Sequence, residues 1–286
     1  MTDDPPPIGA HPLDGVWAKI ARAGQHIITL ERVVETHCEK HLLDLVVRQA
    51  EDGSFVVFLH PTLKPPIHFA AVLGDIASNL RSALDQLAWQ LALRELGDEC
   101  LASDPALARR VSFPIQHTEV AWEANRASIR ALYGDEPTAV VESLQPFTNE
   151  GLRLANPLAV LQAMTNTDKH RVRMSFLAAI AHDDIQIAAS EEIASVRSLV
   201  EPEQIVTHET PLLEVVPIEG TTPDVRARIE TSPVVCFLVE DIGLVRVDQL
   251  RRLGMDIADG IGRFDRFFTP IGDLEERLSK LAVPHR

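Results

Sequence analysis

A line of polar residues in the stretch 66–97 has the composition and spacing of a site for a polar ligand. Its members are Asp75, Asn79, Ser82 and Gln86. At about 100° per residue, these positions share one face of a helix. Arg81 and Asp85 lie beside the line, one turn apart, where a helix brings opposite charges together. These groups would either bind a ligand or hydrogen-bond one another inside the protein.

A second candidate is a run of four consecutive ionisable residues, Asp168, Lys169, His170 and Arg171, placed where a predicted helix gives way to a strand. Such a run is often a solvated turn. If it faces the polar line instead, Asp168 would orient Arg81, and the three basic residues would bind an anion such as a phosphate.

Most sequence signatures of catalysis are missing from the chain. It has no GxxxxGK[ST], no GxGxxG after a strand, no HExxH and no GxSxG. The eleven histidines are scattered, and the three cysteines lie far apart without CxxC pairing. We therefore predict no metal site, no disulfide framework and no cofactor.

The elements that must position these residues follow from hydrophobic periodicity. The stretch 66–97 is predicted to be one long helix, because its leucines and isoleucine recur on one broad face and Gly97 is a plausible stop. An N-terminal helix over Leu13–His41 precedes a β-hairpin formed by Leu43–Gln49 and Ser54–His60, with a turn at 51–53.

Beyond the long helix, three shorter helices are predicted, the first capped by Thr118. Their ranges are 119–132, 137–144 and 158–166. Strands follow, first a hairpin of Val172–Ile180 and Ile185–Ala189, and then four more. Those four are 204–208, 212–217, 225–230 and 234–239. A final helix is predicted over Val247–Phe268.

This order predicts an α+β fold, with a helical core built on the long central helix, an N-terminal hairpin and a C-terminal antiparallel sheet. Residues 1–12 are expected to be a disordered leader, and 13–286 a single composite domain with a possible sub-boundary near residue 171. No apolar run is long enough to span a membrane, and the acidic, Pro-rich start does not resemble a secretory signal, so we expect a cytoplasmic protein.

The formal net charge of −15 disfavours a nucleic-acid partner, which would need a local basic patch to bind. A protein partner or a small anionic ligand is compatible with the charge. The long amphipathic helices also allow a homodimer, either around a site or as a purely structural homo-oligomer.

Four motifs in order resemble a widespread family of uncharacterised bacterial proteins, frequent in actinobacteria. The family pattern reads GDxxHNLRSALDHLxWxL, then FPI, then QPY, then a helix ending in DKHR. This chain matches at Gly74, Asp75, most positions of 79–91, Phe113–Ile115, 145–147 (with Phe for Tyr) and 168–171, so the resemblance covers residues 15–175. It names a family without naming a function.

More remotely, the Arg-x4-His pattern of that family resembles the motif helix of HEPN-superfamily ribonucleases. The resemblance implies metal-independent cleavage of an RNA phosphodiester, with Arg81 stabilising the phosphorane. This chain departs at both family histidines, which are replaced by Ser78 and Gln86. Glutamine cannot exchange a proton near pH 7, so only His170 could serve as the acid or base.

Three hypotheses therefore remain open. In the first, Asp75, Arg81 and Asp85 pair with Asp168 and Arg171 in a structural network. In the second, a degenerate HEPN-like module uses the polar line and residues 168–171 to bind a partner or small anionic ligand. In the third, Arg81 and His170 form a ribonuclease site.

The ribonuclease hypothesis makes a direct prediction. The chain would cleave RNA in the presence of EDTA, and an Arg81→Ala variant would lose that activity because the phosphorane charge is no longer stabilised. A gel assay with labelled RNA measures both. Cleavage that survives the substitution would dismiss the proposed chemistry.

Overall fold

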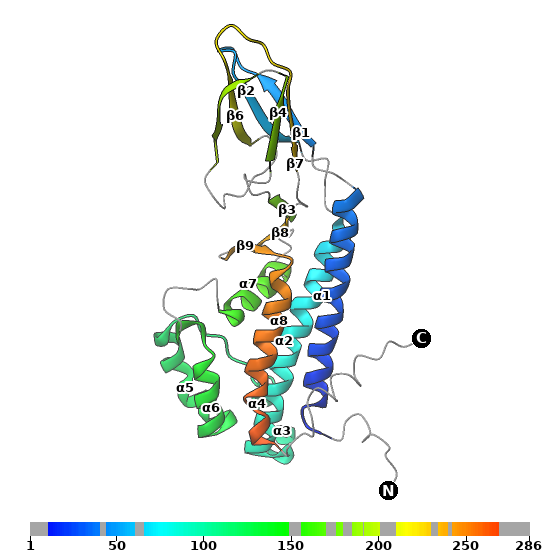
Figure 1. Ribbon diagram of the computed structural model, residues 1–286. Helices are drawn as coiled ribbons and strands as arrows, with labels where there is room; N and C mark the ends of the chain where they lie inside the picture. Colours follow the sequence, from blue (N-terminus) through cyan, green and yellow to red (C-terminus); the bar gives the residue numbers. More distant parts are fainter. Residues whose placement is uncertain are drawn as a thin grey trace, which may run out of the picture.

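The computed structural model describes residues 11–40, 44–60, 66–148, 156–169, 176–179, 185–190, 192–200, 210–229, 234–239 and 242–268. Long helices form an elongated body, and a group of strands stands at one end of it (Figure 1). Helices and antiparallel strands are both present, so the predicted α+β class is confirmed.

The long helix α2 (Ile67–Leu96) agrees with the prediction to within one residue at each end. Pro66 precedes it, and Gly97 ends it with a φ of 81°, donating its N–H to the carbonyl of Leu93. Such a positive φ is readily adopted by glycine alone, which explains the stop at this residue. The predicted apolar face is buried throughout, and alanines on the adjoining faces are buried too. α2 is therefore the central helix of the body.

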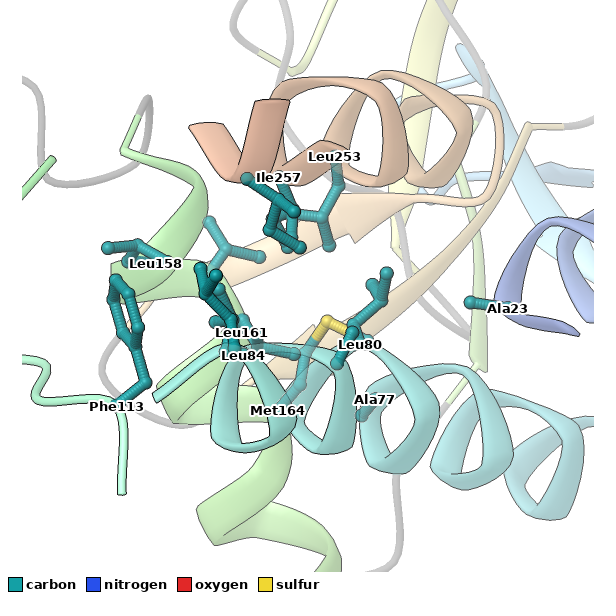
Figure 2. Packing of buried hydrophobic residues seen from close by; sticks show 14 of the residues in the cluster. Ala23, Ala77, Leu80, Leu84, Phe113, Leu158, Leu161, Met164, Leu253 and Ile257 are labelled. Atoms are coloured by element: carbon teal, nitrogen blue, oxygen red, sulfur yellow. The ribbon is translucent and has the colours of Figure 1, made fainter. Parts of the chain in front are cut away.

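Two other long helices pack beside α2, namely α1 (Asp14–Lys40) and α8 (Gln249–Gly262). Figure 2 shows Leu253 and Ile257 of α8 facing Leu80 and Leu84 of α2. The final helix is shorter than the predicted Val247–Phe268, because its glycine-rich end gives way to the 3₁₀ turn η4 (Asp265–Phe267).

Shorter helices complete the body. They are α3 (Asp98–Ser103), α4 (Pro105–Ala108), α5 (Glu119–Tyr133), α6 (Asp135–Ser143), the 3₁₀ turn η1 (Pro146–Thr148) and α7 (Pro157–Lys169). The hydroxyl of Thr118 accepts a hydrogen bond from the N–H of Ala121 at 3.2 Å, which confirms the predicted cap. α3 and α4 were not predicted, although Asp104 caps α4 ahead of a proline in its first turn.

Among the described residues, nine strands pair antiparallel in three sheets. They are β1 (Asp44–Gln49), β2 (Phe55–His60), β3 (Phe176–Ala179), β4 (Ile185–Ala189), β5 (Ile193–Ser198), β6 (Pro211–Pro217), β7 (Val225–Ile229), β8 (Val234–Val239) and β9 (Gly243–Arg246). The sheets have the orders β1-β2-β6-β5, β3-β8-β9 and β4-β7. The N-terminal hairpin β1–β2 is confirmed and joins the C-terminal strands through β6.

The predicted hairpin between Val172–Ile180 and Ile185–Ala189 is wrong. β3 pairs with β8, β4 with β7 and β5 with β6. The pairing is therefore nested: the first strand of this series pairs with the last, and the two middle strands pair with each other. Strand character alone does not determine such non-local pairing. The predicted strand 204–208 lies outside the described residues.

The described residues form two hydrophobic cores. The larger one combines the helices with residues of β8 and β9, including Phe237 and Val245. The smaller one lies among the strands at the end of the body, around Val57 and Val215. Whether 13–286 behaves as one domain stays a prediction. Within the described part of the chain, no helix combines the length and apolar character that crossing a membrane requires.

Candidate functional site

The predicted ion pair on α2 is present. The Nε of Arg81 donates to the Oδ2 of Asp85 at 3.1 Å, and its Nη2 donates to the Oδ1 at 2.9 Å. The two side chains are thus joined by a forked, charge-assisted contact along one turn of helix. Its members are partly shielded, with 20% of the Arg81 side chain and 39% of the Asp85 side chain exposed.

This pair holds the backbone of Phe113. The Nη2 of Arg81 also donates to the Phe113 carbonyl at 2.8 Å, and the Oδ1 of Asp85 accepts the Phe113 N–H at 3.0 Å. Phe113 is buried, with its ring 6.4 Å from that of Phe264 between centroids. Because buried backbone groups must find partners, the pair allows a segment without regular structure to enter the core.

Neighbouring backbone groups of the Ser112–Gln116 segment are held in the same way. Fully buried Gln145 accepts the Gln116 N–H at 2.7 Å and donates to the Pro114 carbonyl at 3.1 Å and the Val141 carbonyl at 2.9 Å. The hydroxyl of Tyr133 donates to the Ser112 carbonyl at 2.8 Å. Side chains from α2, from α5 and from the link between α6 and η1 therefore supply the hydrogen bonds that a neighbouring strand would give.

Three separated sequence motifs meet at this point. The Arg81–Asp85 pair belongs to the motif RSALD, and Phe113 begins the motif FPI. Gln145 begins the motif QPF. A structural network around Arg81 and Asp85 is present, and its partner in the described structure is the Phe113 backbone. The predicted pairing with Asp168 and Arg171 stays a prediction.

The run 168–171 is only partly described. The backbones of Asp168 and Lys169 close α7, whereas their side chains, and all of His170 and Arg171, lie outside the described residues. The pairing of Arg81 with His170 in a ribonuclease site is likewise a prediction that the described residues leave open.

The polar line on α2 divides into two parts. Asp75 is exposed, and the half-buried Asn79 donates its Nδ2 to the Asp75 carbonyl at 2.8 Å. Ser82 and Gln86, together with Asp85, line a cleft of about 810 Å³. A helix rises 1.5 Å per residue, so Asp75 lies about 16 Å from Gln86 along the axis, too far for all four to bind one small ligand.

This cleft lies between the start of α1 and the second half of α2. Besides the three predicted residues, its lining consists of His11, Pro12, Asp14, Gly15, Lys19, Trp89, Gln90 and Val111. These residues were missed by sequence reasoning. No sequence pattern marks them, and the packing of α1 on α2 shows why one of them matters: a Cβ on Gly15, in the first turn of α1, would come within 2.7 Å of the Oε1 of Gln86. Gly15 therefore makes room for that carboxamide.

Several polar groups of the cleft have no protein partner within the described part of the chain. These are the hydroxyl of Ser82, the carboxamides of Gln86 and Gln90, and the ammonium of Lys19. Asp85, in contrast, accepts three hydrogen bonds from Arg81 and Phe113. The free donors and the ammonium of Lys19, which forms no ion pair among the described residues, suit a ligand that carries a negative charge, and the Asp14 and Asp85 carboxylates line other parts of the same cleft.

Two further residues that line the cleft, His11 and Asp14, form hydrogen bonds at the start of α1. The backbone N–H of His11 donates to the Oδ2 of Asp14 at 3.1 Å, and the Nδ1 of His11 accepts the Leu13 N–H at 3.1 Å. Among the described residues, no group of three His, Cys, Asp or Glu side chains could hold a metal ion.

The hydrogen-bond network around Phe113 shifts the pKa of one of its members, the phenol of Tyr133. Burial raises the pKa of the Tyr133 phenol well above its ordinary range, and the nearby Asp85 carboxylate raises it further. The phenol therefore stays protonated at any physiological pH and keeps its hydrogen bond to the Ser112 carbonyl.

Comparisons with protein-family models, curated proteins and solved structures found no match to this chain.

We predict that a Gln145→Leu substitution lowers the free energy of unfolding by about 1–3 kcal/mol, because the Gln116 N–H and the Pro114 carbonyl lose their buried partner. Urea unfolding followed by circular dichroism measures the change. A Gln162→Leu variant, which removes a solvent-facing hydrogen bond to Asn166, is the matched control and should stay within about 0.5 kcal/mol of the parent. Equal losses in both variants would contradict the role assigned to Gln145.

The raised pKa of Tyr133 predicts a pH dependence that absorbance can follow, since the chain has one tyrosine. The folded protein should show no phenolate at pH 11, whereas the urea-unfolded chain should titrate near pH 10. Because the folded pKa is the higher one, this contribution to stability is complete below about pH 10 and is lost as the pH rises. A phenolate that forms near pH 10 in the folded chain would be evidence against the buried hydrogen bond.

Proposed function

We propose that this protein is a non-catalytic, HEPN-like module that binds a small anionic ligand in the cleft between α1 and α2. The observation that carries the proposal is the set of unpartnered groups in the cleft. Lys19, Ser82, Gln86 and Gln90 converge there without hydrogen-bond or ion-pair partners among the described residues. Partly exposed polar groups that face a common space and have no protein partner are available to hydrogen-bond a ligand.

The size and lining of the cleft support a small organic anion. Its volume of about 810 Å³ falls within the range of small-molecule sites. Trp89 adds an aromatic surface, and Gln86 and Gln90, one turn apart, offer carboxamide donors and acceptors along the same wall. Lys19 would bind the carboxylate or phosphate of such a ligand from the opposite helix.

Binding is better supported than acid–base chemistry. The Nε and Nη2 of Arg81 are already bonded to Asp85 and to the Phe113 carbonyl, so its guanidinium serves the fold. Gln86 stands where the resembling family has a histidine, and a carboxamide does not exchange protons near pH 7. These features favour a module that has kept the helix motif of a nuclease-like ancestor without its chemistry.

The Lys19→Ala substitution tests the proposal. Calorimetric titration of the full chain with inorganic phosphate, citrate and a nucleoside monophosphate should identify at least one binder. Lys19→Ala should weaken that binding about tenfold or more, because a charge-assisted contact is lost. Gly15→Ala should weaken it as well, since the added Cβ displaces the Gln86 carboxamide.

Arg22→Ala is the matched control for this experiment. Arg22 is an exposed basic residue of α1 that does not line the cleft, so its loss changes the net charge equally and should leave the affinity nearly unchanged. Equal weakening by both variants would show long-range electrostatics instead of a site, and no binding of any of the anions would reject the proposal.

A further inference from the structure

A second pocket lies on the other side of the Phe113 segment from the cleft between α1 and α2. One of its walls is the chain from Arg110 to Gln116, and the opposite wall is α5. α4 and the end of α2 also contribute to it, and Figure 1 shows these elements at the same end of the helical body. The pocket has a volume of about 530 Å³, which is within the range of small-molecule sites.

The first wall contributes every second residue to the pocket. These residues are Arg110, Ser112, Pro114 and Gln116. Such alternation is that of an extended backbone, in which successive side chains point to opposite sides. The residues between them point elsewhere, since Val111 lines the cleft between α1 and α2 and Phe113 is buried in the core. The segment therefore separates two distinct binding spaces.

The second wall and the floor of the pocket are largely apolar. Ile129 of α5 is buried beneath it. Partly buried leucines from three helices surround that residue, namely Leu96 of α2, Leu107 of α4 and Leu132 of α5. A ligand with an apolar part would remove the remaining leucine surface from water, which is favourable.

The charge of the pocket is opposite to that of the protein as a whole. Among its described lining residues Arg110 is the only charged one and none carries a carboxylate, although the chain has a formal net charge of −15. Arg110 forms no ion pair in the described part of the chain. The arginines of α5 differ, because Arg126 pairs with Glu123 at 3.1 Å and Arg130 pairs with Asp135. Arg110 is therefore a cation available to an anion in the pocket.

We propose that this pocket binds a small organic acid with an apolar body, whose carboxylate pairs with Arg110 while its hydrocarbon part covers the leucines. A guanidinium binds a carboxylate through two parallel, charge-assisted hydrogen bonds. The hydroxyls of Ser112 and Ser128 and the carboxamide of Gln116 also line the pocket, and they form no hydrogen bond to other described residues. They are further donors for the carboxylate oxygens.

Other ligand classes fit the lining less well. A compact, fully polar anion such as phosphate would pair with Arg110 and leave the leucines uncovered. A neutral hydrocarbon would cover the leucines and make no use of the cation. An acid with an apolar body satisfies both parts of the lining. The assignment does not depend on the proposed function, which concerns the cleft between α1 and α2.

Calorimetric titration of the full chain with acetate, hexanoate and octanoate tests the pocket. The affinity should rise about fourfold with each methylene that is buried, so octanoate should bind and acetate should not. Arg110→Gln should weaken octanoate binding at least tenfold, because the charge-assisted contact is lost. Arg109→Gln is the matched control, since Arg109 is the neighbouring exposed arginine and does not line the pocket.

Filling the pocket with a large side chain gives a second test. Ser128→Trp should abolish octanoate binding, because Ser128 lines the pocket and the indole would occupy its space. Ala127→Trp places the same side chain on the adjacent exposed residue, which does not line the pocket, and should leave the affinity unchanged. Circular dichroism of both variants checks that they remain folded.

Three results would overturn the proposal. The first is the absence of octanoate binding to the parent chain, and the second is equal affinity in the parent, Arg110→Gln and Arg109→Gln. The third is loss of binding in Lys19→Ala, which would place the acid in the cleft between α1 and α2. Binding that is lost in Arg110→Gln and Ser128→Trp but kept in the controls and in Lys19→Ala supports the pocket.

Discussion

Arg81 and Asp85 bind both backbone polar groups of one buried residue, Phe113, and the arrangement of the helical body depends on this contact. Phe113 enters the core on a segment that pairs with none of the described strands, so its N–H and carbonyl would otherwise be buried unpaired. A single helical turn of α2 satisfies both groups at once. Because α5 and α6 follow directly along the chain, this contact fixes where that helix pair attaches to the central helix.

The long elements were predictable from sequence because their cause is local. A sustained apolar period, Gly97 and Thr118 were enough to place α2 and the start of α5 within one residue. The pairing of strands was not predictable in this way, since β3 meets β8 only after the whole of β4–β7 has intervened. Period-2 patterns identify strands and leave their partners open.

The candidate site shows the same division. The Arg81–Asp85 ion pair follows from a spacing of four residues, but its role depends on a backbone 28 residues further along the chain. The polar line was correct as a helix face, yet only its second half reaches a cleft, because the start of α1 covers that part of α2 alone. Lys19 and Gly15 gave no pattern of their own, and only packing of α1 on α2 shows their importance.

The nested strand order has a consequence for how the chain reaches this structure. Phe237 and Val239 of β8 belong to the larger hydrophobic core, and so do several residues of α8, which follows β8. A large part of this core is therefore made by residues that come after strands β4–β7 in the sequence. Pairing β3 with β8 closes a long loop and costs chain entropy, which is offset only when the contacts between these two strands form. During synthesis, α1 and α2 would thus emerge with an apolar side still uncovered, and the helical core would be completed last by its C-terminal helix.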